Sequence, residues 1–266
     1  MLPRLRHLGR LYRVFLRNCL VREMEFRANF FASLSTIVGW LLYYILLIDL
    51  IYRNTESIAG WSKGEALVLS GSFTIIWALL NGLFYDNLSE LPLMIERGTF
   101  DLVLTKPVGS QFFLSTRRIT LSELARVLGS VVVVIYGAHM AGLHPAPGIL
   151  LLYLLMLACG LVILYSIYAL LMTLSFWFVR LQNLDVVLWS AASIARYPLD
   201  IFSRIPRTIL TFVIPLAFLS TVPARALRGV LTGELALAGV VFAFLLFTAS
   251  RLFWRFALRF YSSAGG

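Results

Sequence analysis

The chain has 266 residues, of which 60% are hydrophobic and only 14% charged, and its formal net charge is +10. An ordinary soluble domain is about 45–50% apolar and about 25% charged, so the composition excludes one. The apolar residues stand in blocks of about 20, which is the length that crosses a bilayer core, and they do not alternate as barrel strands do. We therefore predict an all-α polytopic membrane protein. Its basic residues flank the spans rather than belong to a soluble fold, so no nucleic-acid partner is expected.

Residues 1–28 are predicted to form an amphipathic helix that lies in the membrane interface. Apolar residues recur along one face of this helix, and arginines recur along the nearly opposite face. These arginines are Arg6, Arg10, Arg13 and Arg17. Such a helix directs its basic face toward the anionic headgroups of membrane lipids. In the simpler alternative, the same residues are only a positively charged anchor that orients the first span.

Six transmembrane helices are expected in the domain formed by residues 29–266. The expected spans are residues 29–51, 64–85, 119–140 and 149–178, a segment that starts near Leu184, and residues 235–256.

The segment 196–229, between the last two expected spans, is broken by prolines and arginines in an apolar background. Non-helical backbone at membrane depth must be covered by protein or line a wet cavity. We therefore predict a re-entrant segment before the last helix. The residues that mark it are Arg196, Pro198, Asp200, Pro215 and Pro223.

The distribution of arginines predicts the orientation. The N-terminal segment, the loop 86–118 and the C-terminus are rich in basic residues, whereas the loop 52–63 and the turn 141–148 are poor in them. The positive-inside rule then places both termini and the loop 86–118 in the cytoplasm. Four arginines fall on the outer side in this topology: Arg204, Arg207, Arg225 and Arg228. Either the re-entrant segment uses them for substrate or headgroups, or the region is threaded differently.

The loop 86–118 is the longest polar interruption, and its pattern indicates two short helical pieces. Gly98 is well placed to end the first piece, and Thr99 can cap the second. Asp101 lies near the N-terminus of the second piece, where negative charge is favourable, and Lys106-Pro107 ends it. We expect a compact charged element on which a soluble partner docks; the alternative is an ordinary solvated loop.

The segment Glu96–Pro107, between the second and third spans, resembles the coupling region of bacterial ABC-2 type permease subunits. Two later motifs, Arg196-Tyr197-Pro198-Leu199-Asp200 and Ile214-Pro215-Leu216 with Val222-Pro223-Ala224, are similar to the pattern before that family's last span.

The resemblance implies a permease subunit of an exporter in the bacterial inner membrane. It implies pairing with a second permease chain, identical or related, and two soluble ATP-binding cassette subunits beneath the pair. Residues 1–28 would be the connecting helix. The residues implied to contact the ATPase are Glu96, Arg97, Gly98, Thr99, Asp101 and Lys106.

Motifs for catalysis are absent from the sequence. It has no Gly-x-x-x-x-Gly-Lys-Ser/Thr phosphate loop, and His7, His139 and His144 do not form a metal-ligand spacing. We therefore expect no enzyme activity and no cofactor in this chain, with ATP and Mg²⁺ held by the partner subunit.

The alternative function is an ion-coupled secondary transporter or a channel. Proteins of that class place ionisable residues at the membrane midplane. The candidates in this chain are Glu123, Arg126, Asp185 and Arg196. The substrate is not indicated by any motif.

Overall fold

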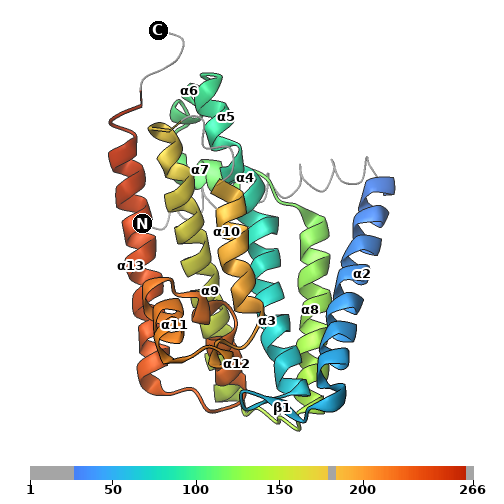
Figure 1. The fold of residues 1–266 in the computed structure, drawn as a ribbon. Coiled ribbons are helices and arrows are strands. Elements are labelled where there is room, and N and C mark those ends of the chain that lie inside the picture. Colours follow the sequence, from blue (N-terminus) through green and yellow to red (C-terminus); the bar gives the residue numbers. More distant parts are fainter. Residues whose placement is uncertain (1–26, 179–183, 262–266) are drawn as a thin grey trace.

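The computed structural model describes residues 27–178 and 184–261. Long helices stand side by side in a bundle (Figure 1). They are α2 (Arg27–Ile51), α3 (Lys63–Leu80), α8 (Leu121–Met140), α9 (Pro147–Thr173) and α13 (Gly233–Ala257). Five helical segments are long and apolar enough to cross a membrane: Ser35–Asn54, Lys63–Glu96, Leu121–Met140, Pro147–Phe176 and Gly233–Ala257. These segments confirm a helical polytopic membrane protein and correspond to five of the expected spans.

The first two spans are joined by a tight polar connection. A short helix, η1 (Tyr52–Asn54), leads into the antiparallel strands β1 (Ser57–Ile58) and β2 (Trp61–Ser62). Ser62 then starts α3 with a capping box, because its hydroxyl accepts from the Glu65 amide while the Glu65 carboxylate accepts from the Ser62 amide. This local chemistry explains why α3 begins where it does.

The helix of the second span continues past Tyr85, where the span was expected to end. It continues without a break in its path through three short helices to Glu96, over 34 residues in all. These helices are the π-helical η2 (Asn81–Tyr85), α4 (Asp86–Ser89) and α5 (Leu91–Glu96). At 1.5 Å per residue the whole segment is about 50 Å long, whereas a bilayer core is about 30 Å thick. The α5 end therefore projects beyond the bilayer, and Figure 1 shows it above the ends of α2 and α8.

Glycines bring α3 and α8 into close contact. A Cβ atom placed on Gly137 would lie 2.7 Å from the Gly64 carbonyl oxygen and 2.8 Å from the Leu67 Cβ. A Cβ atom on Gly71 would lie 2.7 Å from the Val134 Cγ2. Within lipid the hydrophobic effect does not drive helices together, so close van der Waals packing at small residues does. The seam between these two helices depends on the glycines having no side chain.

The helix at the expected fifth span is short in the described residues. The helix α10 spans Leu184–Ser193, which is about 15 Å, or half of a bilayer core. The short helix η4 (Ile194–Arg196) follows it. The count of six spans therefore stays a prediction.

The segment 196–229 is irregular, as the prolines predict. It forms a series of short helices near the β1 end of the bundle (Figure 1). They are η5 (Leu199–Ile201), α11 (Arg204–Thr208), η6 (Ile209–Val213), η7 (Leu216–Leu219) and α12 (Thr221–Leu227). The later part is buried, and a Cβ on Gly160 of α9 would collide with the Phe218 carbonyl oxygen. Protein thus covers the non-helical backbone there, as membrane depth requires; that the segment is re-entrant stays a prediction.

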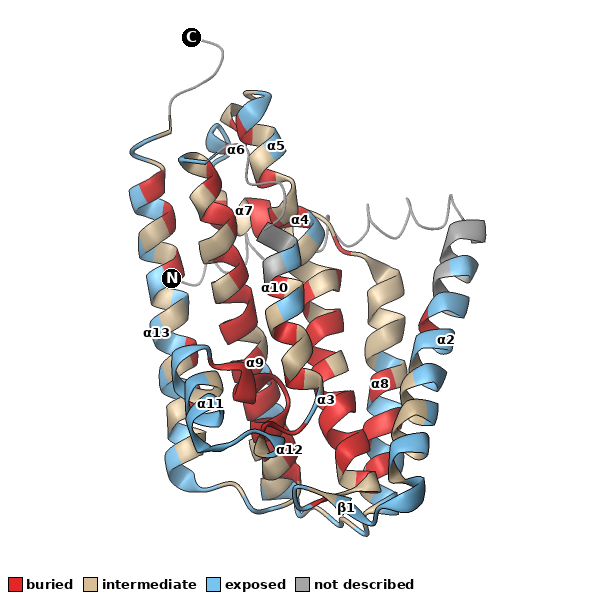
Figure 2. Cartoon of the chain, viewed as in Figure 1, coloured by how far each residue is buried: buried red, intermediate tan, exposed pale blue. Residues whose placement is uncertain are grey.

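The core of the bundle follows α3, α9 and α12, while α2 and α13 present exposed faces (Figure 2). The exposed side chains on these outer helices are themselves apolar: Leu46 is 65% exposed and Phe244 is 69% exposed. Large apolar patches of this kind are rare on soluble monomers. Lipid or a second chain is the environment that suits them.

Candidate functional site

The first candidate site is the projecting hairpin that we call the coupling tip, residues 91–106. The helix α5 ends at Glu96, and Gly98 follows with a φ of +67°, the left-handed conformation that favours glycine. The short helix α6 (Asp101–Leu104) then runs to just before Lys106-Pro107. The predictions that Gly98 ends one helix and that Asp101 starts the next are confirmed.

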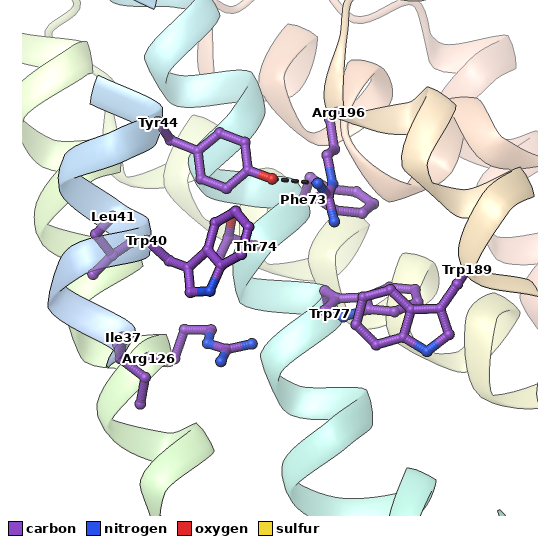
Figure 3. Close-up of a pocket in the computed structure, with 10 residues that line it drawn as sticks. All are labelled: Ile37, Trp40, Leu41, Tyr44, Phe73, Thr74, Trp77, Arg126, Trp189 and Arg196. Atoms are coloured by element: carbon purple, nitrogen blue, oxygen red, sulfur yellow. Dashed lines mark hydrogen bonds between the residues drawn. The ribbon is translucent and has the colours of Figure 1, made fainter. Parts of the chain in front are cut away.

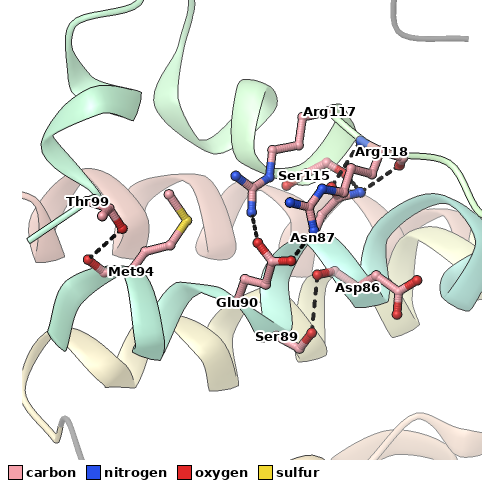
Figure 4. A network of polar contacts seen from close by, with 9 residues as sticks. All are labelled: Asp86, Asn87, Ser89, Glu90, Met94, Thr99, Ser115, Arg117 and Arg118. Carbon is pink, nitrogen blue, oxygen red and sulfur yellow. Dashed lines mark hydrogen bonds and ion pairs between the residues drawn. The ribbon is translucent and has the colours of Figure 1, made fainter. Parts of the chain in front are cut away.

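Thr99 does not cap α6, contrary to the prediction. The residue before α6 is Phe100, and no side chain caps the helix. The Thr99 hydroxyl instead donates to the carbonyl oxygen of Met94 at 3.4 Å (Figure 4). The left-handed turn at Gly98 folds Thr99 back onto α5. The prediction considered only the residues around α6 and did not include this reversal of the chain.

The polar residues of the coupling tip face outward. Glu96, Arg97, Thr99 and Lys106 are exposed, whereas Gly98 and Asp101 are half-buried. Leu102 stands among them and is 66% exposed. A groove of about 450 Å³ runs between α5 and α6 and reaches α7 (Ser110–Thr116). Its lining includes Leu93, Arg97, Leu102 and Lys106. The tip thus combines an exposed apolar residue with a basic rim, a composition suited to protein contact.

Phe100 anchors the coupling tip to the bundle. Its side chain is fully buried, and its ring centroid lies 5.1 Å from that of Tyr261 and 5.4 Å from that of Phe176. Phe176 belongs to η3 (Leu174–Phe176) at the end of α9, and Trp254 of α13 joins the cluster at 6.1 Å. The indole of Trp254 also donates to the Ser110 hydroxyl at 3.0 Å. Sequence reasoning missed Phe100; an aromatic residue within a charged turn was the only signal.

Asp101 lies beside Tyr261 of this cluster. Burial and the adjacent Asp101 carboxylate raise the pKa of the Tyr261 phenol to about 12. Asp101 is half-buried, and its contact with the ATPase stays a prediction.

A second network joins the base of the coupling tip to α7 and to the segment that enters α8 (Figure 4). The buried Asn87 amide donates to the carbonyl oxygens of Ser115 at 3.2 Å and Arg118 at 2.8 Å, and it accepts from the Arg118 amide at 3.0 Å. Glu90 forms ion pairs with both Arg117 and Arg118. In the sequence analysis these two arginines served only to predict the orientation of the chain in the membrane. In the fold they hold α4 and α5 against the segment that enters α8.

The opposite end of the bundle carries a polar cluster around Asp200. Its carboxylate accepts from the Trp61 indole at 2.9 Å, from Arg225 at 2.6 Å and from Arg207 at 3.1 Å. Burial alone would raise the pKa of Asp200, but the Trp61 hydrogen bond and the Arg225 and Arg207 charges outweigh it and hold the pKa below its usual value. The cluster ties the irregular segment to the β1–β2 connection.

Arg228 adds a second link at this end. Its guanidinium lies 2.6 Å from the Glu65 carboxylate and 4.6 Å from the Trp61 ring centroid. Three of the four arginines that the topology places outside therefore form ion pairs within the chain, which accounts for their position without a substrate. The fourth, Arg204, is exposed.

The residues predicted to mark the re-entrant segment do not form one site. Pro198 and Pro215 precede η5 and η7, and Pro223 lies in the first turn of α12. Asp200 lies at the centre of its polar cluster, whereas Arg196 points toward Tyr44 of α2. The arginines predicted for the interfacial helix lie outside the described residues: Arg6, Arg10, Arg13 and Arg17.

No metal site appears in the described part of the chain, where no group of three or more His, Cys, Asp or Glu side chains could hold an ion. The described residues form a helical membrane bundle, a projecting tip and buried joints between them.

The fold defines a multi-pass helical membrane protein. A family model described as "ABC-2 family transporter protein" matches residues 38–265, so the chain belongs to this family. It is a membrane-embedded permease component of an ABC transporter and not itself the catalytic part. Comparison with curated proteins and with solved structures finds no match.

Proposed function

We propose that this chain is the permease subunit of an ABC exporter in the bacterial inner membrane. In this proposal it pairs with a second permease chain and is driven by two separate subunits that bind ATP and Mg²⁺. The observation that carries the proposal is the coupling tip, which is exposed at its polar end and firmly joined to three membrane helices at its base.

The docking contact is proposed to centre on Leu102. A protruding apolar residue surrounded by charges is a typical anchor, because it fills a pocket on the partner while the charged rim sets orientation. Arg97 and Lys106 lie at the basic side of the groove. The ATPase surface that fits them carries an apolar pocket with carboxylates at its edge.

The joints at the base of the tip supply a route for coupling. ATP binding closes the two ATPases on each other and moves the docked tips. Phe100 transmits this motion to the ends of α9 and α13, and the network of Asn87 and Glu90 transmits it to α8. The permease pair is thereby biased from an inward-facing to an outward-facing state, by no more than the difference in contact free energy between them.

Two further features support the assembly. The arginine distribution favours a cytoplasmic tip and cytoplasmic termini. The exposed apolar face of α2, with Leu46 and Leu50 at 65% and 61% exposure, offers a surface for a second permease chain.

The proposal is tested by purifying the tagged chain from its native host in nanodiscs, with mass spectrometry of the co-purifying proteins and an ATPase assay. We expect a stoichiometric phosphate-loop ATPase, which is lost in the Glu96→Ala/Arg97→Ala variant and in Leu102→Asp. Arg53→Ala, at an exposed arginine near the other end of the bundle, is the matched control and should retain the ATPase. A chain that purifies alone and without ATPase activity would instead favour an ion-coupled transporter or a channel.

A further inference from the structure

A cavity of about 240 Å³ lies between α2, α3, α8 and α10, away from both the coupling tip and the Asp200 cluster. Figure 3 shows its walls: Trp40 and Tyr44 come from α2, Phe73 and Trp77 from α3, and Trp189 from α10. Two arginines, Arg126 of α8 and Arg196 of η4, complete the lining with Ile37, Leu41 and Thr74. The cavity is therefore an aromatic chamber that contains two guanidinium groups.

Arg196 has no carboxylate partner among the side chains that the structure describes. Its guanidinium donates to the Tyr44 hydroxyl and lies 5.5 Å from the ring centroids of Tyr44 and Phe73. Its Nε atom is buried without a hydrogen-bond partner. Tyr44 and Phe73 both belong to membrane-spanning segments, so this positive charge reaches between two spans. A charge at such a position is costly and marks a functional site by default.

Arg126 brings a second positive group to the same space. It forms an ion pair with Glu123 at 3.3 Å, yet its Nε atom is also buried without a hydrogen-bond partner. In Figure 3 the guanidinium groups of Arg126 and Arg196 approach the chamber from opposite ends. The lining of the chamber contains these two guanidinium groups and no carboxylate, so it carries an excess of positive charge.

The walls between the two arginines are apolar and rigid. The rings of Trp77 and Trp189 meet edge to face with centroids 4.3 Å apart, and Phe73 stacks on Trp77 at 5.8 Å. The indole nitrogen of Trp77 is buried and has no hydrogen-bond partner among the described residues, so it offers one more donor. Guanidinium donors next to aromatic faces match a ligand with an anionic group and an apolar body.

We propose that this chamber binds an acidic amphiphile, with its carboxylate or phosphate held by Arg196 and Arg126 and the first part of its apolar body against the tryptophans. The volume is below the 300–1,000 Å³ typical of sites that enclose a drug-sized ligand, so it takes the headgroup and adjoining carbons only. An anionic membrane lipid and a transported acid share this chemistry. The identification as transported substrate rests on the proposed export function, whereas the binding site does not.

The test is direct binding to the full-length chain in phosphatidylcholine nanodiscs. The probe is 2-bromoundecyl phosphate, whose bromine lies next to the headgroup and quenches tryptophan fluorescence on contact, and 2-bromoundecanol is its neutral control. We expect the wild-type chain to be quenched by the phosphate at a mole fraction about tenfold lower than by the alcohol, because a charge-assisted bidentate contact adds to the same apolar burial.

Arg196→Gln and Arg126→Gln should each remove most of this preference for the phosphate while leaving quenching by the alcohol unchanged. If the arginine only held α2 in place, its replacement would change quenching by the phosphate and by the alcohol to the same extent. Arg204→Gln, which removes the same charge at an exposed site, is the matched control and should keep the full preference. If Arg196→Gln does not fold, Arg196→Lys serves instead, since it keeps a point charge but not the bidentate geometry; its preference should fall and not vanish.

Equal quenching of the wild type by the phosphate and the alcohol would overturn the proposal, as would a full preference in both arginine variants. Replacing part of the phosphatidylcholine with phosphatidylglycerol separates the two sources. Competition by phosphatidylglycerol identifies a lipid headgroup as the ligand, and persistent quenching identifies a free acidic amphiphile. The assay contains no ATPase, so its failure leaves the test of the coupling tip unaffected.

Discussion

The buried ring of Phe100 lies 5.4 Å from the ring of Phe176, edge to face, so the exposed coupling tip contacts the end of α9 directly. A displacement of the tip is therefore transmitted to α9 through packed aromatic rings rather than through a flexible loop.

Phe100→Ala should separate docking from coupling. Removing a fully buried phenylalanine costs about 3–5 kcal/mol of stability, because contacts are lost and a cavity remains. The ATPase should still co-purify, since the outward side chains of the tip are unchanged, but transport-linked ATPase activity should fall. The measurements are the thermal unfolding midpoint and the ATPase rate of the complex in nanodiscs. Leu104→Ala, at an exposed leucine of the same tip, is the control; an equal loss in both variants would contradict the role of Phe100.

Asn87→Ala should loosen the joint between α4 and the segment Ser115–Arg118 that leads into α8. It removes the side-chain amide that donates to the carbonyl oxygens of Ser115 and Arg118 and accepts from the backbone N–H of Arg118. Each buried polar group left unpaired costs about 1–3 kcal/mol. Hydrogen exchange at the Arg118 amide should rise. Asn87→Asp keeps the acceptor but loses the donors, so its effect on this amide should be smaller. Unchanged exchange in the alanine variant would argue against the joint.

The Asp200 cluster should weaken in acid. Because the folded state holds the pKa of Asp200 below its usual value, the carboxylate contributes stability that is present above about pH 4 and is lost as the pH falls through the depressed pKa. Trp61 fluorescence in a single-tryptophan background should report this loss below pH 4. Asp200→Asn should remove the pH dependence, whereas Glu56→Gln, at an exposed carboxylate, should leave it in place.

Gly137→Leu should separate α3 from α8. A Cβ at this position already collides with the Gly64 carbonyl oxygen, and overpacking costs about 1–3 kcal/mol or more when the backbone cannot move. Gly39→Leu is the matched control, because it also lies within a spanning helix but nothing is within 4 Å of its Cβ position. The unfolding midpoint in detergent should fall for the first variant and stay close to the wild type for the second.

Local patterns were sufficient for much of the fold. The lengths of the apolar blocks predicted five spans that the structure confirms, and Gly98 with Lys106-Pro107 predicted the ends of the short helices in the tip. The prediction for Thr99 was wrong, because the hydroxyl turns back to Met94 when the chain reverses at Gly98. The helix of the second span continues beyond the predicted end of the span at Tyr85 and projects out of the bilayer core, where α4 packs on α7.

The sequence by itself determined the class of this protein, because burial in lipid demands long apolar helices and positive flanks, and both are local properties of the chain. Only the tertiary structure decided which residues of the chain contact one another across the bundle. It joined Phe100 to α9 and α13, paired Asp200 with Trp61 from 139 residues away, and brought Arg126 and Arg196 to one chamber. Such pairings depend on how helices far apart in the sequence pack together, and neither hydropathy nor spacing along the chain records that geometry.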